Sequence, residues 1–495
     1  MLAFLAGTAR RTRCRLPHRA FTAPYGSGAA TDETICAVAS GVGTRAAVAV
    51  LRVSGPRAFD VLHALAPETA RAPPKPRNLS RCDLYAPETG RLLDRAMAVA
   101  FRGPASFTGE DVVELHTHGG RAVVRDVLEA VQAAGARLAT PGEFTRRAFL
   151  HGKLDLVQAE GLADLINADT AWQRDVALRN LEGEFGRQCD AWRAEVISMA
   201  ARLTAVVDFG EDERIDDDVV PGVVADLRRV AEEIRVLVQH ADRGDVARDG
   251  LRLAIVGPTN GGKSTMMNFL TRRAVALVSD VPGTTRDSIE SLLDMDGYPV
   301  RLTDTAGIRS QTDDALERAG MDLARRHRQD AQVTLVVVDA HDAAAAAEYL
   351  ADSAGEAIDE AVAARTILVV NKCDDGRVPD SAADIEAMFG TRAAHVLHVS
   401  LHTSFNTAAV SSTIHERVRD VLEPMTESTL ATRGRFVRHL DDCLGHMDAA
   451  LATMGDLELA AEELRLATEA LGAVTGRVVH DEVLEVLFSQ FCIGK

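Results

Sequence analysis

Cysteine is scarce in this sequence and is never paired at short spacing. Of 495 residues only 7 are cysteine, an odd number, and no two of them form a CxxC pair. This argues against a CxxC-based zinc site and against a disulfide framework, and it fits a reducing compartment. No apolar run reaches the length of about 18 residues that a membrane-spanning helix needs. The sequence therefore predicts no membrane span.

Positive charge is also in short supply. Lys and Arg number 55 against 73 Asp and Glu, so the formal net charge is −18. A protein that binds nucleic acid on its own needs clustered Lys and Arg to neutralise phosphates. Any contact with nucleic acid is therefore local or shared with a partner. The length and the ordinary globular composition favour about three folded domains.

Residues 1–31 contain no aspartate or glutamate, but they contain several arginines. The apolar MLAFLA precedes these arginines, whereas a secretory signal places its charges first. An acid-free, arginine-bearing start is typical of a mitochondrial transit peptide, and the competing interpretation is a disordered tail. We expect residues 1–31 to be a transit peptide and the protein to be located in the mitochondrial matrix.

The remaining sequence divides by its hydrophobic pattern. Short β-like runs around one helical stretch predict an α+β domain over residues 32–150. Helical periodicity over 151–249 and 414–495 predicts a helical domain. Residues 250–413 alternate short apolar strands with helices, which is typical of a doubly wound α/β sheet. The fold class is thus multidomain α/β, with the α/β domain inserted into the helical one.

A phosphate-binding loop opens the inserted domain. Residues 257–264 read GPTNGGKS, which matches G-x-x-x-x-G-K-[ST] and stands between a predicted strand and a predicted helix. Glycines allow backbone N–H groups to surround phosphate oxygens, Lys263 brings positive charge to the β- and γ-phosphates, and the Ser264 hydroxyl ligates Mg²⁺. This pattern alone also fits an ATPase.

Three further segments favour GTP over ATP. They follow in order as TTR (284–286), DTAG (304–307) and NKCD (371–374). Asp374 can accept hydrogen bonds from both N1–H and the exocyclic amine of guanine, a pair of donors that adenine lacks. The loop after Val399 reads Ser-Leu-His where guanine-binding loops commonly read Ser-Ala-Lys, so we assign no contacts there.

The roles of the predicted nucleotide site follow from these segments. Asp304 would hold the magnesium shell, the Gly307 N–H would sense the γ-phosphate, and Thr285 would complete the ligands of Mg²⁺. The predicted GTP-binding residues are Gly257, Asn260, Gly261, Gly262, Lys263, Ser264, Thr265, Thr284, Thr285, Asp304, Thr305, Ala306, Gly307, Asn371, Lys372 and Asp374.

Hydrolysis also requires a group that positions the attacking water. Ile308 follows Gly307, so the glutamine used in other GTPases is not at that place. Glu317 could act on the water through a second water molecule. The simpler interpretation of Glu317, taken alone, is a solvated residue that opens a helix.

Three segments outside the GTPase motifs carry a family resemblance. They are SFTGEDVVELHTHGG (106–120), TPGEFTRRAFLHGKLDLVQAEGLADLI (140–166) and LFSQFCIGK (487–495). Together they resemble the MnmE/TrmE family of tRNA-modifying GTPases, in the same domain order from about residue 32 to the end.

The resemblance implies a catalytic centre and a cation site. It implies a homodimer formed through the N-terminal domain, GTPase domains that also dimerise, and hydrolysis stimulated by K⁺. Glu317 matches the family's catalytic glutamate, acting with Lys263, and Cys492 becomes a possible active-site thiol in place of an inert one. The implied potassium ligands are Asn260, Ser279, Val281 and Thr284.

The resemblance also implies that the N-terminal domain binds 5-formyl- or 5,10-methylene-tetrahydrofolate. The implied residues are Arg52, Glu114, Lys153 and Lys495. A pterin needs a carboxylate for its amine and ring N–H, and a glutamate tail needs Lys or Arg.

The implied activity is addition of a (carboxymethyl)aminomethyl-type or taurinomethyl group to C5 of the wobble uridine in mitochondrial tRNAs. An FAD-dependent MnmG-type partner would share the chemistry and carry most of the tRNA contact. Two other interpretations remain open: an RNA-binding ribosome-assembly GTPase switch without modification activity, and a folate enzyme that acts alone. The sequence does not determine the amine or the choice of tRNAs.

Overall fold

The computed structural model describes residues 33–40, 46–72, 74–209, 218–241, 250–273, 275–277, 290–304, 331–352, 363–374, 380–390, 393–428, 433–478, 481–489, 491 and 494. The predicted transit peptide, residues 1–31, lies outside these ranges. The chain forms two compact units, Met1–Asp155 with Val479–Lys495 and Leu156–Val478. Within the described ranges no helix is both long enough and apolar enough to cross a membrane.

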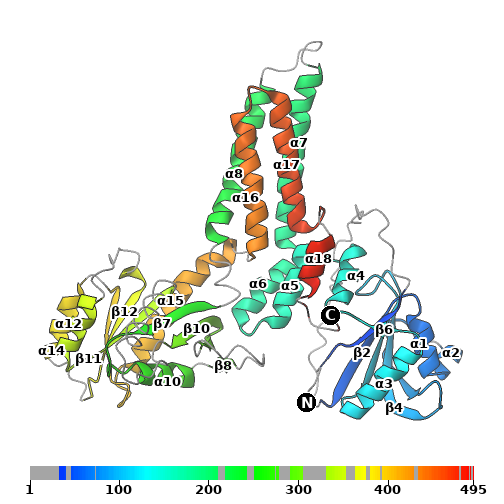
Figure 1. Cartoon of the computed structure of the whole chain (residues 1–495), viewed down its shortest axis with the longest axis horizontal. Coiled ribbons are helices and arrows are strands. Elements are labelled where there is room, and N and C mark those ends of the chain that lie inside the picture. Colours follow the sequence, from blue (N-terminus) through cyan, green and yellow to red (C-terminus); the bar gives the residue numbers. More distant parts are fainter. Residues whose placement is uncertain are drawn as a thin grey trace, which may run out of the picture. The chain divides into compact units, whose positions relative to one another are not determined.

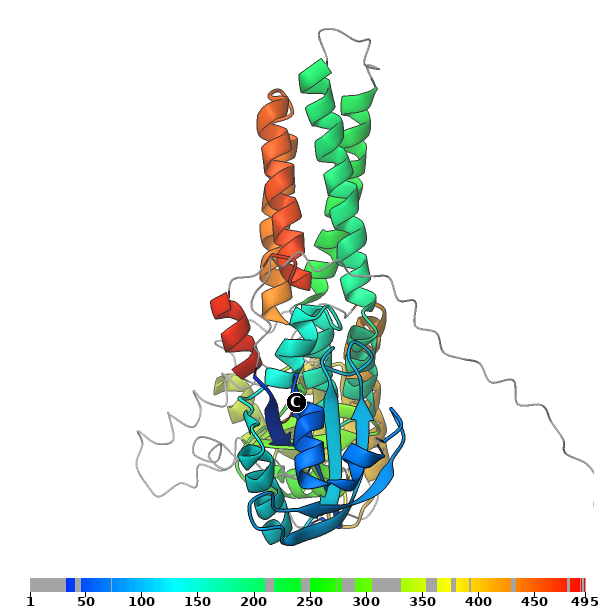
Figure 2. The ribbon, with the colours of Figure 1, turned by 90° about the vertical axis from the view of Figure 1, so that its right-hand side faces the viewer.

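The first unit contains a six-stranded sheet in the order β3-β4-β5-β2-β1-β6. Neighbouring strands are antiparallel except β1 and β6. The strands are β1 (Ile35–Val38), β2 (Val48–Ser54), β3 (Ser80–Tyr85), β4 (Leu92–Phe101), β5 (Val112–His118) and β6 (Arg137–Leu138). Figure 2 shows these strands in blue and cyan with helices packed beside them.

Alternation along the strands separates two faces of this sheet. Leu51 and Val53 of β2 lie in a buried core with side chains of α1 (Ala58–Leu65) and α3 (Arg121–Ala133). Arg52, between them, points to the other face and lies over the Phe107 and Phe144 rings. A short helix, α2 (Glu68–Arg71), follows α1. The predicted α+β domain and its helix near residues 122–134 are confirmed.

The C-terminal segment belongs to this first unit. Helix α18 (Asp481–Ser489) packs against α4 (Glu143–Leu150), and the Phe149 and Phe488 ring centroids are 6.3 Å apart. A Cβ added at Gly494 would lie 2.4 Å from the carbonyl oxygen of Val38, so only glycine fits there. The sequence analysis placed residues 414–495 in the helical domain, and helical periodicity alone could not show that α18 leaves it.

The second unit contains a four-helix bundle (Figure 1). Its helices are α7 (Glu184–Phe209), α8 (Val219–Ala241), α16 (Gly434–Ala452) and α17 (Leu457–Thr475). Apolar residues at helical spacing, such as Val196, Met199 and Leu203 of α7, form one shared core. The helical prediction for these segments is confirmed.

Two further helices join the bundle to the inserted domain. These are α5 (Leu156–Asn167) and α6 (Ala171–Leu181), and a capping box between Thr170 and Gln173 starts α6. Trp172 of α6 is buried with the strands of the inserted domain, and its backbone N–H donates to the carbonyl oxygen of Gly297 at 3.0 Å.

The inserted domain is a seven-stranded sheet in the order β13-β12-β11-β7-β10-β9-β8. Its strands are β7 (Leu251–Val256), β8 (Val275–Leu277), β9 (Glu290–Met295), β10 (Tyr298–Asp304), β11 (Val333–Asp339), β12 (Thr366–Asn371) and β13 (His395–His398). The central strands are parallel, and β9 and β8 are antiparallel additions. The predicted strands near 251, 333, 366 and 395 are confirmed.

Helices cover both faces of this sheet. Helices α10 (Lys263–Arg273) and α15 (Thr407–Ser428) share a core on one face, and α12 (Ala343–Asp352) and α14 (Asp380–Phe389) share a core on the other. Strand β12 is buried along its whole length, as expected for a parallel strand between two helical layers. This is the predicted doubly wound architecture.

Candidate functional site

The phosphate-binding loop lies between β7 and α10, where its glycines are required by the backbone. Gly257, Asn260 and Gly262 have positive φ angles of 139°, 65° and 104°. A Cβ at Gly257 would lie 2.2 Å from the carbonyl oxygen of Val337 in β11. The loop is therefore tightly curled at the carboxyl ends of two parallel strands, a place where α/β sheets bind ligands.

The Lys263 ammonium group lies across this loop. Its Nζ donates to the carbonyl oxygen of Gly257 at 2.9 Å and to that of Pro258 at 2.7 Å. These carbonyl contacts hold the charge where phosphate oxygens can replace them. Ser264 and Thr265, in the first turn of α10, are exposed. A hydroxyl oxygen in that position suits Mg²⁺, which prefers oxygen ligands.

Asn371 joins three loops around the base site. Its Nδ2 donates to the carbonyl oxygen of Gly261 at 3.1 Å, and its Oδ1 accepts from the Leu401 N–H at 3.1 Å. Only 4% of Asn371 is exposed, so both contacts are shielded from water. The phosphate loop, the end of β12 and the loop after β13 are thereby fixed to one another.

Asp374 is oriented by the loop that the sequence analysis left unassigned. The Ser400 hydroxyl donates to Asp374 Oδ1 at 2.6 Å and accepts from the Thr403 N–H at 3.0 Å. Ser400 is fully buried. Lys372 pairs with Asp339 at 2.6 Å. The serine of the common Ser-Ala-Lys sequence is thus present and in contact, although the residues after it differ.

Several predicted residues cannot be placed. Asp304 ends β10 and is paired with Ile255 of β7, but its side chain lies outside the description. Other predicted residues lie wholly outside the described ranges: Ser279, Val281, Thr284, Thr285, Thr305, Ala306, Gly307, Glu317, Cys492 and Lys495.

Two of the predicted pterin residues form a direct pair in the first unit. Arg52 and Glu114 stand opposite each other in β2 and β5, and the Arg52 Nε and Nη2 atoms are 2.9 and 2.8 Å from Glu114 Oε1. The Arg52 guanidinium carbon lies 5.4 Å from the Phe107 ring centroid and 5.8 Å from that of Phe144. A carboxylate beside aromatic rings provides the partners that a flat heterocycle with amide-like N–H groups needs.

Lys153, a third predicted pterin residue, is tied to the loop that carries Phe107. Its Nζ donates to the carbonyl oxygen of Pro104 at 2.9 Å. Lys153 is exposed apart from that contact, which is compatible with a salt bridge to a flexible carboxylate. The residues present fit a folate with its pterin on the sheet face.

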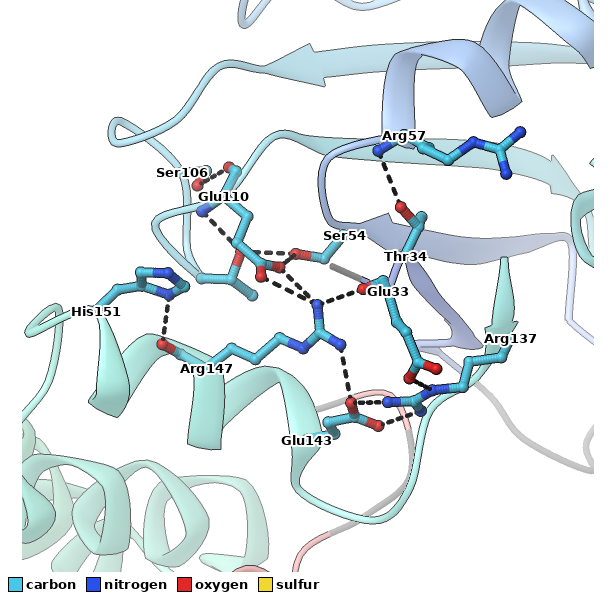
Figure 3. Close-up of polar contacts among 11 residues, drawn as sticks. Glu33, Thr34, Ser54, Arg57, Ser106, Glu110, Arg137, Glu143, Arg147 and His151 are labelled. Atoms are coloured by element: carbon cyan, nitrogen blue, oxygen red, sulfur yellow. Dashed lines mark hydrogen bonds and ion pairs between the residues drawn. The ribbon is translucent and has the colours of Figure 1, made fainter. Parts of the chain in front are cut away.

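A buried ion network lies in the same unit and was not predicted (Figure 3). Arg147 donates to Glu110 at 3.0 Å and to Glu143 at 3.0 Å, with 5% of its side chain exposed. Arg137 donates to both oxygens of Glu143, at 2.9 and 2.7 Å, and to Glu33 at 2.6 Å. The only local signal was the four-residue spacing of Glu143 and Arg147 on one helix.

Glu143 stays ionised within this network. Burial alone would raise the pKa of its carboxyl, but hydrogen bonds from Arg137, the Thr140 N–H and Arg147 lower that pKa from 4.5 to about 2. Because the pKa is lower in the folded protein, this carboxylate stabilises the fold fully above pH 4.5. Its contribution is lost as the pH falls toward 2.

Replacing Glu143 with glutamine is therefore expected to destabilise α4 by about 3 kcal/mol at pH 7 and by much less near pH 3. Hydrogen exchange of the α4 amides measures this directly, whereas both tryptophans, Trp172 and Trp192, lie in the other unit. Glu129→Gln, an exposed change on α3, is the control. An equal loss of protection at both pH values would show that the charge of Glu143 is not responsible.

The described cysteines are poor nucleophiles. Five of them, at positions 36, 82, 189, 373 and 443, are free and buried. Burial raises the pKa of the Cys36 and Cys82 thiols to about 11 and that of Cys443 to about 12. A reactive thiolate would need the opposite shift.

Comparisons with known proteins cover almost the entire chain. The family models "GTP-binding protein TrmE N-terminus" and "MnmE helical domain" match residues 34–153 and 156–492. A "tRNA modification GTPase MnmE" from a Methylobacterium species is 42% identical over 471 residues, which is 94% of this chain and 100% of that protein. A protein of the same description from Parvibaculum lavamentivorans is 43% identical over 468 residues, again 94% of this chain and 100% of the relative.

A solved structure of the GTPase Era from Aquifex aeolicus, bound to GDP and AlF4−, is similar to 34% of this chain and to 56% of that chain. The identity is 23% and the TM-score is 0.27, a likeness too low to support an argument.

Proposed function

Because the chain belongs to the MnmE/TrmE family of tRNA modification GTPases, we propose that its GTP hydrolysis drives modification of C5 of the wobble uridine in mitochondrial tRNAs. The chain is a GTP hydrolase that forms GDP and phosphate. The added group is of the (carboxymethyl)aminomethyl or taurinomethyl type, and its one-carbon unit comes from a tetrahydrofolate. The observation that carries the proposal is 42% identity over 94% of the chain, through both units.

In the nucleotide site the described residues bind and orient GTP. The phosphate loop amides and Lys263 hold the phosphates, and Lys263 exchanges its contacts with Gly257 and Pro258 for phosphate oxygens. Asp374, oriented by Ser400, accepts the two guanine donors. Water then attacks the γ-phosphorus and GDP leaves, with Glu317 proposed to position that water.

Two cations complete the proposed site. Mg²⁺, held by Ser264 and Thr285, neutralises charge on the phosphates. K⁺, surrounded by Asn260, Ser279, Val281 and Thr284, supplies positive charge that an arginine finger supplies in other GTPases. Asn260 has the unusual positive φ of 65°, which fixes its place in the phosphate loop.

The potassium proposal predicts that hydrolysis depends on the monovalent cation. At equal ionic strength, we expect GTP turnover to be on the order of 10- to 100-fold faster in KCl than in NaCl. Steady-state phosphate release by the purified full chain measures the difference. A rate that is indifferent to the cation would rule out this role for potassium.

In the first unit Arg52, Glu114, Lys153 and Lys495 are proposed to bind 5-formyl- or 5,10-methylene-tetrahydrofolate. Glu114 would accept the pterin amine and ring N–H, and the lysines would pair with the glutamate tail. The Arg52–Glu114 pair at 2.8 Å supports this assignment because it holds the carboxylate in a fixed orientation on the sheet face. Cys492 is a possible reactive thiol at the same end of the chain.

The proposed assembly is a homodimer that works with an FAD-dependent MnmG-type partner in the mitochondrial matrix. The formal net charge of −18 supports a shared mode of tRNA binding, in which the partner supplies most of the positive charge. Release of the γ-phosphate would let paired GTPase domains separate and so couple hydrolysis to the modification cycle.

Nucleoside mass analysis tests the proposed function. Cells that lack this protein are expected to have wobble uridines without the added mass in their mitochondrial tRNAs. Unchanged uridines would favour a ribosome-assembly switch. Loss of the modification that a variant without GTPase activity repairs would favour a folate enzyme acting alone.

A further inference from the structure

Arg147 binds three separate segments of the first unit through one guanidinium group (Figure 3). Its Nη1 donates to the carbonyl oxygen of Glu33 at 2.9 Å and to the two Glu110 oxygens at 3.0 and 3.1 Å. Its Nη2 donates to Glu143 at 3.0 Å. The segment before β1, the loop before β5 and helix α4 are therefore held at a single buried point.

The loop that Glu110 belongs to is fastened to the strand of Arg52. The Ser54 hydroxyl, at the end of β2, donates to Glu110 Oε2 at 2.6 Å and lies 2.7 Å from the Thr108 hydroxyl. The Ser106 hydroxyl donates to the carbonyl oxygen of Glu110 at 2.5 Å. These contacts leave the loop from residue 103 to residue 110 little freedom once Glu110 is fixed.

This loop and α4 carry the contacts of the pterin residues. Phe107 of the loop and Phe144 of α4 both lie against the Arg52 guanidinium. Pro104 of the loop accepts the hydrogen bond from Lys153. Fixing the loop and α4 relative to each other therefore fixes the orientation of Arg52 and Lys153.

Stability alone is a poor explanation for this network. Buried ion pairs often contribute less than well-packed apolar residues of similar volume. Arg147 Nε is also buried, with no hydrogen-bond partner among the described residues, which costs free energy. A network that leaves a donor of its central residue unsatisfied, yet orders the surroundings of a binding site, is better explained by positioning.

We propose that Arg147 is a positioning residue for the tetrahydrofolate site, acting through Glu110 and Glu143 on the loop and helix that hold Arg52 and Lys153. This inference rests on the proposed folate-binding function. Among the contacts of the described residues Arg147 bonds to none of Arg52, Glu114 and Lys153, so its effect on the ligand is indirect.

Arg147→Lys tests the proposal, with Arg137→Lys as the matched control. A lysine keeps the charge but cannot bond to Glu33, Glu110 and Glu143 together. Arg137 shares Glu33 and Glu143 with Arg147, but 40% of its side chain is exposed and its bonds do not include Glu110. Both changes therefore weaken the network, and only the first releases the loop.

Two measurements on the purified full chain separate positioning from general stability. Calorimetric titration with 5-formyl-tetrahydrofolate should show at least a tenfold loss of affinity for Arg147→Lys and less than a twofold change for Arg137→Lys. Hydrogen exchange over residues 103–110 should accelerate only in Arg147→Lys. Glu110→Gln, which keeps the shape of the side chain, should reproduce both effects if the first variant does not fold.

The outcomes distinguish this inference from the function it rests on. Wild-type affinity in the folded Arg147→Lys or Glu110→Gln chain would overturn the positioning role and leave folate binding intact. Equal losses of affinity in Arg147→Lys and Arg137→Lys would overturn it as well, since they would reflect stability alone. A wild-type chain that binds no tetrahydrofolate would overturn both the folate proposal and the inference.

Discussion

Replacing Lys263 with alanine is expected to lower kcat/KM for GTP hydrolysis by at least about 1000-fold, on the scale of other lost transition-state contacts. Lys263 bonds to the carbonyl oxygens of Gly257 and Pro258 in the structure, so its ammonium is already at the mouth of the phosphate loop. It provides the positive charge nearest to the β- and γ-phosphates, where negative charge is redistributed during hydrolysis. Phosphate release under steady-state conditions measures the loss.

Arg272→Ala provides the matched control for this change. Arg272 is exposed near the other end of α10, so its removal deletes a positive charge from the same helix without touching the loop. The control is expected to hydrolyse GTP within about twofold of the wild type, as is usual for exposed surface changes. A Lys263→Ala chain that retained more than a tenth of the wild-type activity would contradict the assigned role.

Replacing Asp374 with asparagine is expected to exchange the preference for GTP for a preference for XTP. Asparagine presents one donor and one acceptor where aspartate presents two acceptors, and xanthine carries a carbonyl in place of the guanine amine. A mismatch that leaves buried polar groups unpaired costs at least about 100-fold in kcat/KM. Competition between the two nucleotides for hydrolysis measures the change.

Asp384→Asn is the control for Asp374, because Asp384 is exposed on α14 and its replacement removes the same charge. The control should keep the preference for GTP. The Ser400 hydroxyl bonded to Asp374 at 2.6 Å explains why the switch should be sharp, since it leaves the side chain one orientation. An Asp374→Asn chain that still preferred GTP would show that the base is recognised elsewhere.

Local patterns were sufficient to predict the inserted domain and its nucleotide loops. Each strand from β7 to β13 that was predicted is a short apolar run flanked by turn residues, and the loop at 257–264 follows a strand and opens a helix as its motif requires. Chemistry at fixed spacing along the chain survives folding because neighbouring residues stay neighbours.

The ion network around Arg147 could not be predicted in this way. Glu33 and Glu110 lie 114 and 37 residues away from Arg147 in sequence, and only the sheet and α4 bring them together. The same holds for α18, whose helical period says nothing about the unit it packs on. Arg52 and Glu114 were named from a family resemblance, and their direct pairing depends on the register of β2 with β5.

The central claim is that this chain uses GTP hydrolysis to modify the wobble uridine of tRNA, and complementation tests it most directly. Cells lacking the protein would receive the wild type, Lys263→Ala or Arg272→Ala, and the mass of the wobble nucleoside in mitochondrial tRNA would be measured. We expect the modified nucleoside to return with the wild type and with Arg272→Ala, and to stay absent with Lys263→Ala. Full modification in cells that carry only Lys263→Ala would contradict the account.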